Sequence, residues 1–393
     1  MSATPPGQTP VPTPPPEVSG QGSSVRRILI DIVHPADVLF FRHPILRLTE
    51  AGHEIRILSR EKDVAAQLLD DFALPHRQVS QAGHGILGLG FELLRRDAAL
   101  LAEALRFKPH VLTGFGAVAA AHAGFLLRIP SIAFYDSDQP MLQTRITWPV
   151  VTRLVVPEAF DGRIAAGRTL RLAGTKELSF FHPRRFTPDR NAALALGLDP
   201  DRPNLLLRLV AMRANHDIGK AGWSPEAVTE ITAALAQEGV VHLSAEAGAE
   251  IGAEAGSGAV QSGPVTADRR LNKTGPRLRP YRGPAKAIHQ LMAQCRLVAG
   301  QSATMAAEAA VLGVPALYAG PDRPGYVRAL ADAGLIRLSA PGDVAGFLAE
   351  ARAALAEPPE AQRNRRDAWI ADKPDWSDAI ANAILETAVP AGP

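Results

Sequence analysis

GQSATMAAEAAVLGVPAL, residues 300–317, joins a run of small residues to a helical segment that carries a single acid, Glu308. RLVAG (296–300), just before it, is a short apolar run typical of a buried strand, so a helix begins directly after a strand. A helix N-terminus presents unpaired N–H groups and the positive end of the helix dipole, which together bind anions, phosphate above all. The stretch therefore predicts an α/β unit with a phosphate site at its strand–helix turn.

The small residues at this turn fit such a site. Ser302, Ala303 and Thr304 allow the backbone to approach a phosphate closely. Glu308, about one helical turn further on, offers a carboxylate that can accept two hydrogen bonds from a ribose diol. We expect the phosphates at the helix start and the ribose over the first turn. The alternative is an ordinary Ser/Thr N-cap followed by a solvated acid, which is a common arrangement.

Strands and helices alternate through the rest of the chain in two blocks. The first runs from RRILIDIV (26–33) to LRLAG (170–174), and the second from NLLLRLV (204–210) to VPALYAG (314–320). Such alternation predicts parallel sheets covered by helices on both faces. We therefore expect an α/β fold with two Rossmann-like, doubly wound domains facing each other across a cleft, with ligands at the carboxyl ends of the strands.

Changes in composition mark the predicted boundaries. The tail at the N-terminus consists mostly of Pro, Thr, Ser and Gly and cannot bury a core. The predicted parts are a disordered Pro-rich tail (1–24), an N-terminal domain (25–185), an interdomain connection (186–203), a C-terminal domain (204–375) with an exposed insertion near 247–280, and a C-terminal segment (376–393) whose helix packs back on the N-terminal domain.

Bulk composition argues against several classes of function. The formal net charge of +2 over 393 residues offers no electrostatic basis for binding nucleic acid. Cys295 is the single cysteine, so neither an internal disulfide nor a cysteine zinc cluster can form. No uninterrupted run of about 20 apolar residues and no signal-type apolar segment is present. We expect a cytoplasmic protein, with peripheral contact to the inner face of a membrane as an option.

Several segments resemble known families. SATMAAEAAVLGVPAL (302–317) looks like the nucleotide-binding segment of GT-B proteins, as in the non-hydrolysing UDP-N-acetylglucosamine 2-epimerases and the MurG-type glycosyltransferases. Other segments resemble more closely the DUF354 family of predicted glycosyltransferases: LIDIVHPADVLFFRHPILRLTEAGHEI (29–55), REKDVAAQLLDDF (60–72), FYDSDQPMLQTRITWPVVTRLVVPEAF (134–160), AGTKELSFFHP (173–183) and RLVAMRANHDIG (208–219).

This resemblance covers about 28–350 and implies a GT-B fold, with the acceptor on the N-terminal domain and the nucleotide sugar on the C-terminal domain. Two positions depart from the family pattern. Ser302-Ala303 stands where the family has Gly-Gly, and Ala303 lacks glycine's freedom at positive φ. Asp37 stands where the family usually has a second His after His34. The first departure puts the phosphate loop in question.

Polar residues after the strands of the first block are candidates for catalysis. His34 follows the first strand, and a His there can act as general base on an acceptor hydroxyl, although a structural, helix-capping His is the alternative. Asp136 follows a later strand and is our second catalytic candidate, with an N-cap role as its alternative. The candidate sugar or acceptor contacts are Asp37, Asp138, Gln139, Arg145 and His216.

The loop after NLLLRLV supplies a candidate cation. In a GT-B protein this loop faces the cleft, and Arg213 in it can neutralise the departing diphosphate. With helix N–H groups and an arginine in that role, we expect no bound metal and no cofactor. The polar residues of 136–145 also lack the spacing of a metal site.

GILGLGFELLRR (85–96) combines apolar side chains with arginines and is followed by Arg106 and Lys108. Apolar side chains bordered by basic ones can rest on an anionic membrane, which would suit a lipid-linked acceptor. The alternative is a helix packed on its own sheet.

Together these features predict a metal-independent glycosyltransferase. We expect it to move a sugar from a nucleotide diphosphate sugar, with UDP as the expected nucleotide, to an acceptor of cell-surface polysaccharide or glycoconjugate synthesis. One alternative is a nucleotide-sugar 2-epimerase, although the Gly-Thr-Arg-Pro-Glu motif of those enzymes is replaced by HPAD after the first strand. The other is a non-catalytic nucleotide-sugar-binding protein. The sequence specifies neither base, sugar, acceptor nor stereochemistry.

Overall fold

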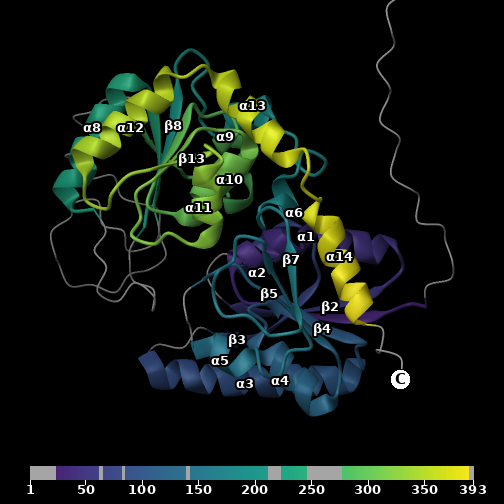
Figure 1. Cartoon of the computed structure of the whole chain (residues 1–393). Coiled ribbons are helices and arrows are strands. Elements are labelled where there is room, and N and C mark those ends of the chain that lie inside the picture. Colours follow the sequence, from purple (N-terminus) through teal and green to yellow (C-terminus); the bar gives the residue numbers. More distant parts are fainter. Residues whose placement is uncertain are drawn as a thin grey trace, which may run out of the picture.

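Seven parallel strands form the sheet of the N-terminal domain in the computed structural model, which describes residues 24–61, 65–81, 85–138, 142–210, 223–245 and 277–388 (Figure 1). The strand order is β3-β2-β1-β4-β5-β6-β7. The strands are β1 (Arg27–Ile32), β2 (Glu54–Glu61), β3 (His76–Gln81), β4 (Val111–Phe115), β5 (Ser131–Phe134), β6 (Arg153–Pro157) and β7 (Thr169–Leu172).

Both faces of this sheet are covered because its central strands are apolar at successive positions. In β1, Ile28 and Ile30 belong to the hydrophobic core on one face of the sheet, whereas Leu29 belongs to the core on the other face. The helices of this domain are α1 (Pro35–Glu50), α2 (Ala65–Asp71), α3 (Gly85–Phe107), α4 (Val118–Leu127), α5 (Leu142–Thr147) and α6 (Leu178–Phe181). Each of the two cores runs along one face of the sheet.

The C-terminal domain repeats this architecture with six parallel strands in the order β10-β9-β8-β11-β12-β13. The strands are β8 (Asn204–Leu209), β9 (Val240–Ala245), β10 (Leu278–Pro280), β11 (Leu297–Gly300), β12 (Ala316–Tyr318) and β13 (Ile336–Leu338). The helices around this sheet are α8 (Pro225–Glu238), η2 (Ala285–Ala287), α9 (Ile288–Met292), α10 (Ala303–Leu312), α11 (Gly325–Asp332) and α12 (Val344–Ala356). The predicted class, two doubly wound α/β domains, is confirmed.

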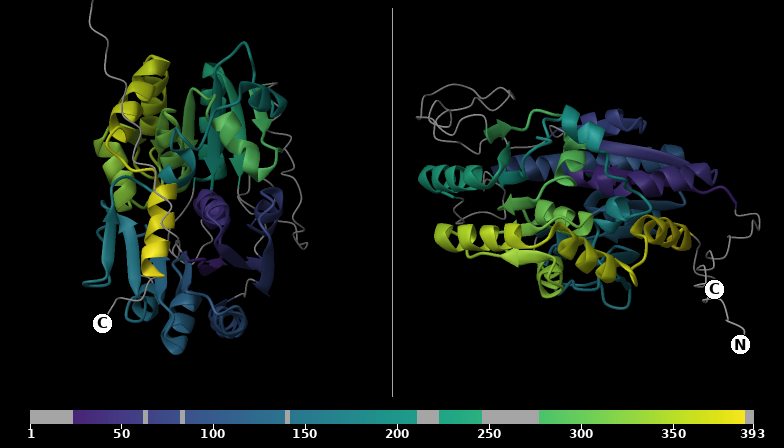
Figure 2. Two further views of the ribbon diagram at one scale, coloured as in Figure 1. Left: turned by 90° about the vertical axis from the view of Figure 1, so that its right-hand side faces the viewer. Right: turned by 90° about the horizontal axis from the view of Figure 1, so that it is seen from above.

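Three helices link the two domains. α7 (Arg190–Ala195) lies in the connection and packs against α9, while α13 (Pro359–Ile370) packs on α10. α14 (Trp376–Thr387) then returns to the N-terminal domain and packs against α1 and α6, as Figures 1 and 2 show. Trp376 Nε1 donates a 2.8 Å hydrogen bond to the Ala173 carbonyl, which fixes the start of α14 on that domain.

The order of the strands places one switch point in each sheet. Chain order reverses direction between β1 and β4 in the first sheet and between β8 and β11 in the second. Segments that follow these strands at their carboxyl ends are the expected ligand sites of doubly wound sheets. His34 follows β1 and GQSAT follows β11, so both predicted sites lie at switch points.

Some predicted boundaries need correction. The predicted insertion near 247–280 ends in a strand: Leu278–Pro280 forms β10 and pairs with β9. The remainder of that segment through residue 276 and the tail through residue 23 lie outside the described residues. The edge strands β3 and β13 and the helices α5 and α13 were not expected.

Candidate functional site

The turn between β1 and α1 holds His34 and Asp37 by backbone hydrogen bonds. His34 is the N-cap of α1, and its Nδ1 accepts a 3.2 Å hydrogen bond from the Ala36 N–H. Asp37 Oδ2 accepts from the N–H groups of Val33 and His34, at 3.0 and 2.8 Å. Burial raises the pKa of Asp37 to about 7, although these backbone donors lower it. Because Nδ1 of the exposed His34 ring accepts the Ala36 N–H, the neutral imidazole carries its proton on Nε2, and that nitrogen is a donor.

Asp31 lies in β1, just before this turn. Its carboxylate is paired with Arg96 of α3, whose Nε donates at 3.0 Å, and both side chains are buried. Asp31 is therefore one member of a buried ion pair.

The carboxyl end of β5 brings two predicted acids to the domain interface. Asp136 is 8% exposed and forms a 2.6 Å ion pair with Lys176. Asp138 accepts a short hydrogen bond from the Gly325 N–H at the start of α11, so it already bridges the two domains. Burial raises the pKa of Asp138, and Asp161 raises it further, while the Gly325 N–H lowers it. Arg145 lies on the exposed side of α5.

Lys176 and Glu177 are the site residues that sequence reasoning missed. They follow β7, in the last part of the predicted N-terminal domain, where the sequence analysis assigns no site residue. Burial alone would lower the pKa of Lys176, but the carboxylates of Asp136, Glu177 and Glu308 raise it above its ordinary value. Lys176 therefore stays protonated. The signal that was available is the pair Lys-Glu directly after a strand, in TKELSFF (175–181).

Glu177 is fully buried behind this ion pair. Burial raises its pKa to about 7, Lys176 lowers it, and Asp136 raises it again. Its two carboxylate oxygens are inaccessible to solvent and have no well-aligned hydrogen-bond partner among the described atoms. A carboxyl group with a pKa near neutrality at the edge of a domain interface is a common property of functional sites.

In the C-terminal domain, the opening stretch forms the predicted strand–helix turn. Ser302 is the N-cap of α10, and its Oγ accepts a 3.3 Å hydrogen bond from the Met305 N–H. Ala303 and Thr304 form the half-buried first turn. Glu308 is only 5% exposed, and its Oε2 lies 3.3 Å from Nε2 of His289. Glu308 is thus a paired, buried acid and not the solvated helix residue of the alternative reading.

The two halves of the site meet through Tyr326 of α11. Its hydroxyl shares a hydrogen bond with the Thr304 side chain, and its ring centroid lies 5.8 Å from Lys176 Nζ. Burial raises the pKa of Tyr326 well above its ordinary range, so the hydroxyl stays protonated. The interface therefore joins the turn of α10 to the Asp136–Lys176 pair.

Three predicted residues lie outside the described part of the chain: Gln139, Arg213 and His216. Their roles, and the roles of the other predicted site residues, stay predictions. Within the described ranges, no group of three or more His, Cys, Asp and Glu side chains is arranged to hold a metal ion.

The surface of α3 bears on the predicted membrane contact. Phe91, Leu94 and Leu105 of this helix are 71%, 69% and 59% exposed. Leu100, Ala104 and Phe107 of α3 belong to the core under the sheet. Glu92 and Arg96 are buried on the same helix, so the side of α3 that packs on the sheet combines apolar and charged residues. No helix in the portion that the structure describes is both long and apolar enough to span a bilayer.

Comparison with known proteins supports the fold and the family resemblance. Residues 26–216 match the family model described as "Protein of unknown function (DUF354)", which confirms the predicted resemblance to that family. No curated protein sequence matches the chain.

Solved structures match nearly the whole length. The UDP-GlcNAc 2-epimerase of Neisseria meningitidis, bound to UDP-GlcNAc, is 13% identical, with 92% of this chain and 99% of that chain covered and a TM-score of 0.61. MurG of Acinetobacter baumannii is 15% identical, with coverage of 92% and 99% and a TM-score of 0.53. The glycosyltransferase of kitacinnamycin is 14% identical, with coverage of 93% and 100% and a TM-score of 0.60.

At such low identity these likenesses establish the fold alone. The chain has the GT-B fold, two Rossmann-like domains, as predicted. The structures it resembles are enzymes of two kinds, glycosyltransferases and 2-epimerases.

Proposed function

We propose that this protein is a glycosyltransferase that uses a nucleotide diphosphate sugar, with UDP as the expected nucleotide. The observation that carries the proposal is the meeting of the two domains at the carboxyl ends of their strands: the N-terminus of α10, with Glu308 beneath it, faces the Asp136–Lys176 pair through Tyr326. The similarity to structures that bind UDP-GlcNAc supports the choice of nucleotide.

The C-terminal domain would hold the donor. Ser302, Ala303 and Thr304 place the N–H groups of the first turn of α10 at the diphosphate, and Glu308 would exchange its His289 partner for the ribose hydroxyls. Lys176, protonated in its acidic surroundings, would stabilise the charge that develops on the leaving diphosphate, together with Arg213. No metal ion is required in this scheme.

The N-terminal domain would hold the acceptor. We assign Asp136 as the group that takes the proton from the acceptor hydroxyl. The acceptor oxygen then forms a bond to the anomeric carbon, the bond from that carbon to the diphosphate oxygen breaks, and the nucleoside diphosphate leaves. His34 would position the acceptor by donating from Nε2, because its Nδ1 is occupied by the Ala36 N–H.

The experiment that tests this function follows the fate of the donor. Wild-type protein is incubated with UDP-N-acetylglucosamine, UDP-glucose or GDP-mannose, with and without a bacterial lipid and glycan extract, and the products are analysed by mass spectrometry and NMR. Acceptor-dependent release of the nucleotide with mass added to the acceptor supports transfer. Conversion of the donor to its 2-epimer without an acceptor would instead identify an isomerase, and binding without turnover a binding protein.

Two variants separate chemistry from binding in this assay. Asp136→Asn should abolish transfer while nucleotide binding persists, because the proton acceptor is lost and the donor contacts remain. Asp201→Asn, an exposed loop substitution, is the matched control and should leave both unchanged. Transfer at wild-type rate in Asp136→Asn would refute the assigned role.

We also propose that the acceptor is lipid-linked and that α3, α4 and α5 face the membrane. The exposed large apolar side chains of these helices are Phe91, Leu94, Leu105, Phe125, Leu126 and Leu142. Exposed basic residues accompany them: Arg95, Arg106, Lys108, Arg128 and Arg145. Sedimentation with vesicles that contain anionic lipid, but not with neutral vesicles, is the expected result, and loss of sedimentation in Phe91→Ser/Leu94→Ser would place the contact on α3.

A further inference from the structure

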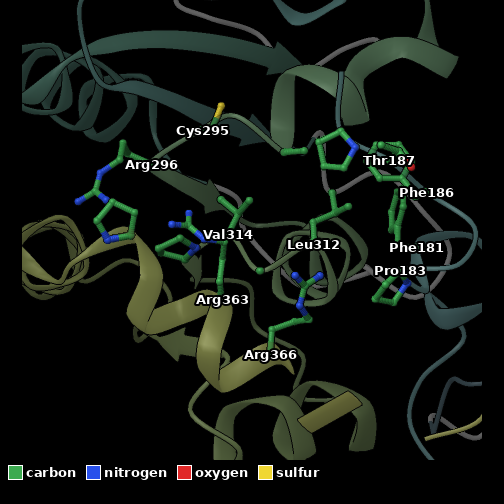
Figure 3. A pocket seen from close by; sticks show the side chains of 15 residues that line it. Phe181, Pro183, Phe186, Thr187, Cys295, Arg296, Leu312, Val314, Arg363 and Arg366 are labelled. Atoms are coloured by element: carbon green, nitrogen blue, oxygen red, sulfur yellow. The ribbon is translucent and has the colours of Figure 1, made fainter. Parts of the chain in front are cut away.

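A cavity of about 360 Å³ lies at the opposite end of the strands of the C-terminal sheet from the proposed donor site. Figure 3 shows the residues that line it. Cys295 and Arg296, just before β11, and Val314 and Pro315, just before β12, form one wall. The cavity therefore lies at the amino ends of these strands, whereas the turn of α10 lies at the carboxyl end of β11. One four-residue strand, about 13 Å, separates the two places.

The other walls come from the segments that link the domains. The end of α6 contributes Phe181, the segment after it contributes Pro183, Phe186, Thr187 and Pro188, and α13 contributes Pro359, Arg363 and Arg366. The residues at positions 359, 363 and 366 share one face of α13, which points into the cavity (Figure 3). A ligand held here would touch both the connection and the C-terminal domain.

The cavity is cationic and apolar at once. Arg296, Arg363 and Arg366 line it, and none of its lining residues is an acid. Arg296 and Arg366 also stabilise helix ends, because Arg296 Nη2 donates to the Leu355 and Glu357 carbonyls and Arg366 Nη1 donates to the Val311 carbonyl. These bonds fix the two guanidinium groups in place and leave other N–H groups of each for a ligand.

Arg363 differs from these two. It is exposed, and its side chain runs past Gly313, where an added Cβ would lie 3.3 Å from Arg363 Cγ and 3.3 Å from Arg366 Cζ. Gly313, with φ of 76°, thus lets both arginines lie close to the end of α10. Outside the lining, Asp367 lies 2.6 Å from Arg366 Nε but is itself 62% exposed, so its charge is screened by solvent.

We propose that this cavity, lined by Arg296, Arg363, Arg366 and the rings of Phe181 and Phe186, is a regulatory site for a small organic phosphate, with the phosphate on the arginines and the apolar body on the rings. Three guanidinium groups around one space suit the several oxygens of a phosphate. The volume suits a small molecule rather than a macromolecule.

The wall of the cavity is connected to the proposed donor site. The Phe181 ring packs edge-on against His289, with centroids 4.7 Å apart, and His289 Nε2 contacts Glu308. Leu312 of the cavity also lies one turn after Glu308 on α10. A ligand that fixes Phe181 therefore changes the freedom of the partner of Glu308. This coupling rests on the proposed function, since it acts through the residue assigned to the ribose.

Calorimetric titration of the full chain tests the site with three probes: inorganic phosphate, phenyl phosphate and geranyl phosphate. We expect one-to-one binding of an organic phosphate, at least about tenfold tighter than inorganic phosphate, because the rings contribute apolar contact. A preference for phenyl phosphate would indicate a soluble metabolite as the source, and a preference for geranyl phosphate a prenyl lipid. Arg363→Ala should weaken binding at least about tenfold, and Arg352→Ala, an exposed arginine of α12 outside the cavity, should not.

A second readout measures the coupling between the cavity and the proposed donor site. UDP titrated in the presence of the organic phosphate should show an affinity changed at least about fivefold, and Arg363→Ala should remove this change.

Several results would overturn the proposal. They are absence of binding at millimolar concentration, unchanged binding in Arg363→Glu, and organic phosphates that bind no tighter than inorganic phosphate. Unchanged UDP affinity at saturation would refute regulation. A protein that binds the organic phosphate but no nucleotide would contradict the proposed function and leave the cavity as a ligand site, so the two failures are distinct.

Discussion

Replacement of Lys176 by methionine should destabilise the protein strongly. Lys176 Nζ lies 2.6 Å from Asp136 Oδ2, and each side chain is 10% exposed. Glu177 and Glu308 also act on this ammonium group. Methionine has a similar length but no charge, so Lys176→Met leaves the surrounding acids buried without their cation.

The size of the effect follows from the geometry. At 2.6 Å and an effective dielectric constant of about 20, the attraction between the two charges is about 6 kcal/mol, and the loss of water around both ions offsets part of it. Removing one member of a buried pair costs about 3–5 kcal/mol. For a domain of this size, that loss lowers the melting temperature by about 10 °C.

A double-mutant cycle, measured by thermal and urea unfolding, assigns the loss to the pair. Asp136→Asn alone should cost less than Lys176→Met, because Glu177 and Glu308 remain near the ammonium group. The double variant should be more stable than the sum of the two single losses predicts, by at least about 1 kcal/mol. A loss below about 1 kcal/mol in Lys176→Met, or additive losses within about 0.5 kcal/mol, would refute the reasoning.

Three further changes test other parts of the site. Burial raises the pKa of Glu177 from 4.5 to about 7, so the folded state holds this proton more tightly than the unfolded state; the stability that results is full below pH 4.5 and lost as the pH rises through 7. Glu177→Gln should therefore reduce the fall in unfolding free energy between pH 5 and pH 8 by on the order of 3 kcal/mol, and an unchanged pH profile would contradict this. Gly325→Ala would place a Cβ 2.0 Å from the Ala159 carbonyl oxygen, so the two domains should move apart. Small-angle scattering should then show a larger radius of gyration. An unchanged radius of gyration and an unchanged melting temperature would argue against a close contact between the domains at Gly325. Ser302→Ala removes the N-cap of α10 and should lower the unfolding free energy by about 1 kcal/mol, whereas Ser302→Gly should cost only a few tenths; equal losses would count against the cap.

The arrangement of the two sheets could be predicted because their central strands are apolar runs. RRILIDIV and NLLLRLV have no polar face, which indicates strands covered on both sides. The edges could not be predicted in this way. β3 is HRQVSQ, a polar edge strand without an apolar pattern, and β13 has only three residues. An edge strand is held in the sheet by backbone hydrogen bonds to its neighbour, so its side chains need not follow the apolar pattern by which a strand is predicted from sequence.

The site was predictable only where chemistry and topology coincide. Ser302 and Glu308 stand at a strand–helix turn that the pattern indicates directly. Lys176 was missed because its importance comes from Asp136, 40 residues earlier, which only the folded sheet brings within 2.6 Å. Asp37 was expected at the acceptor, but its side chain accepts the N–H groups of the turn before α1, which is a local role that the spacing His-Pro-Ala-Asp permits.

The central claim, that the turn of α10 binds a nucleotide diphosphate, is tested most directly by calorimetric titration with UDP, GDP, CDP, ADP and dTDP. The titrations are made on wild-type protein, on Glu308→Ala, and on Glu230→Ala as an exposed control on α8. We predict that one diphosphate binds at micromolar concentration to the wild type and the control, and that Glu308→Ala loses this binding. Absence of binding to the wild type, or equal binding in all three proteins, would contradict the claim and leave α10 as a capped structural helix.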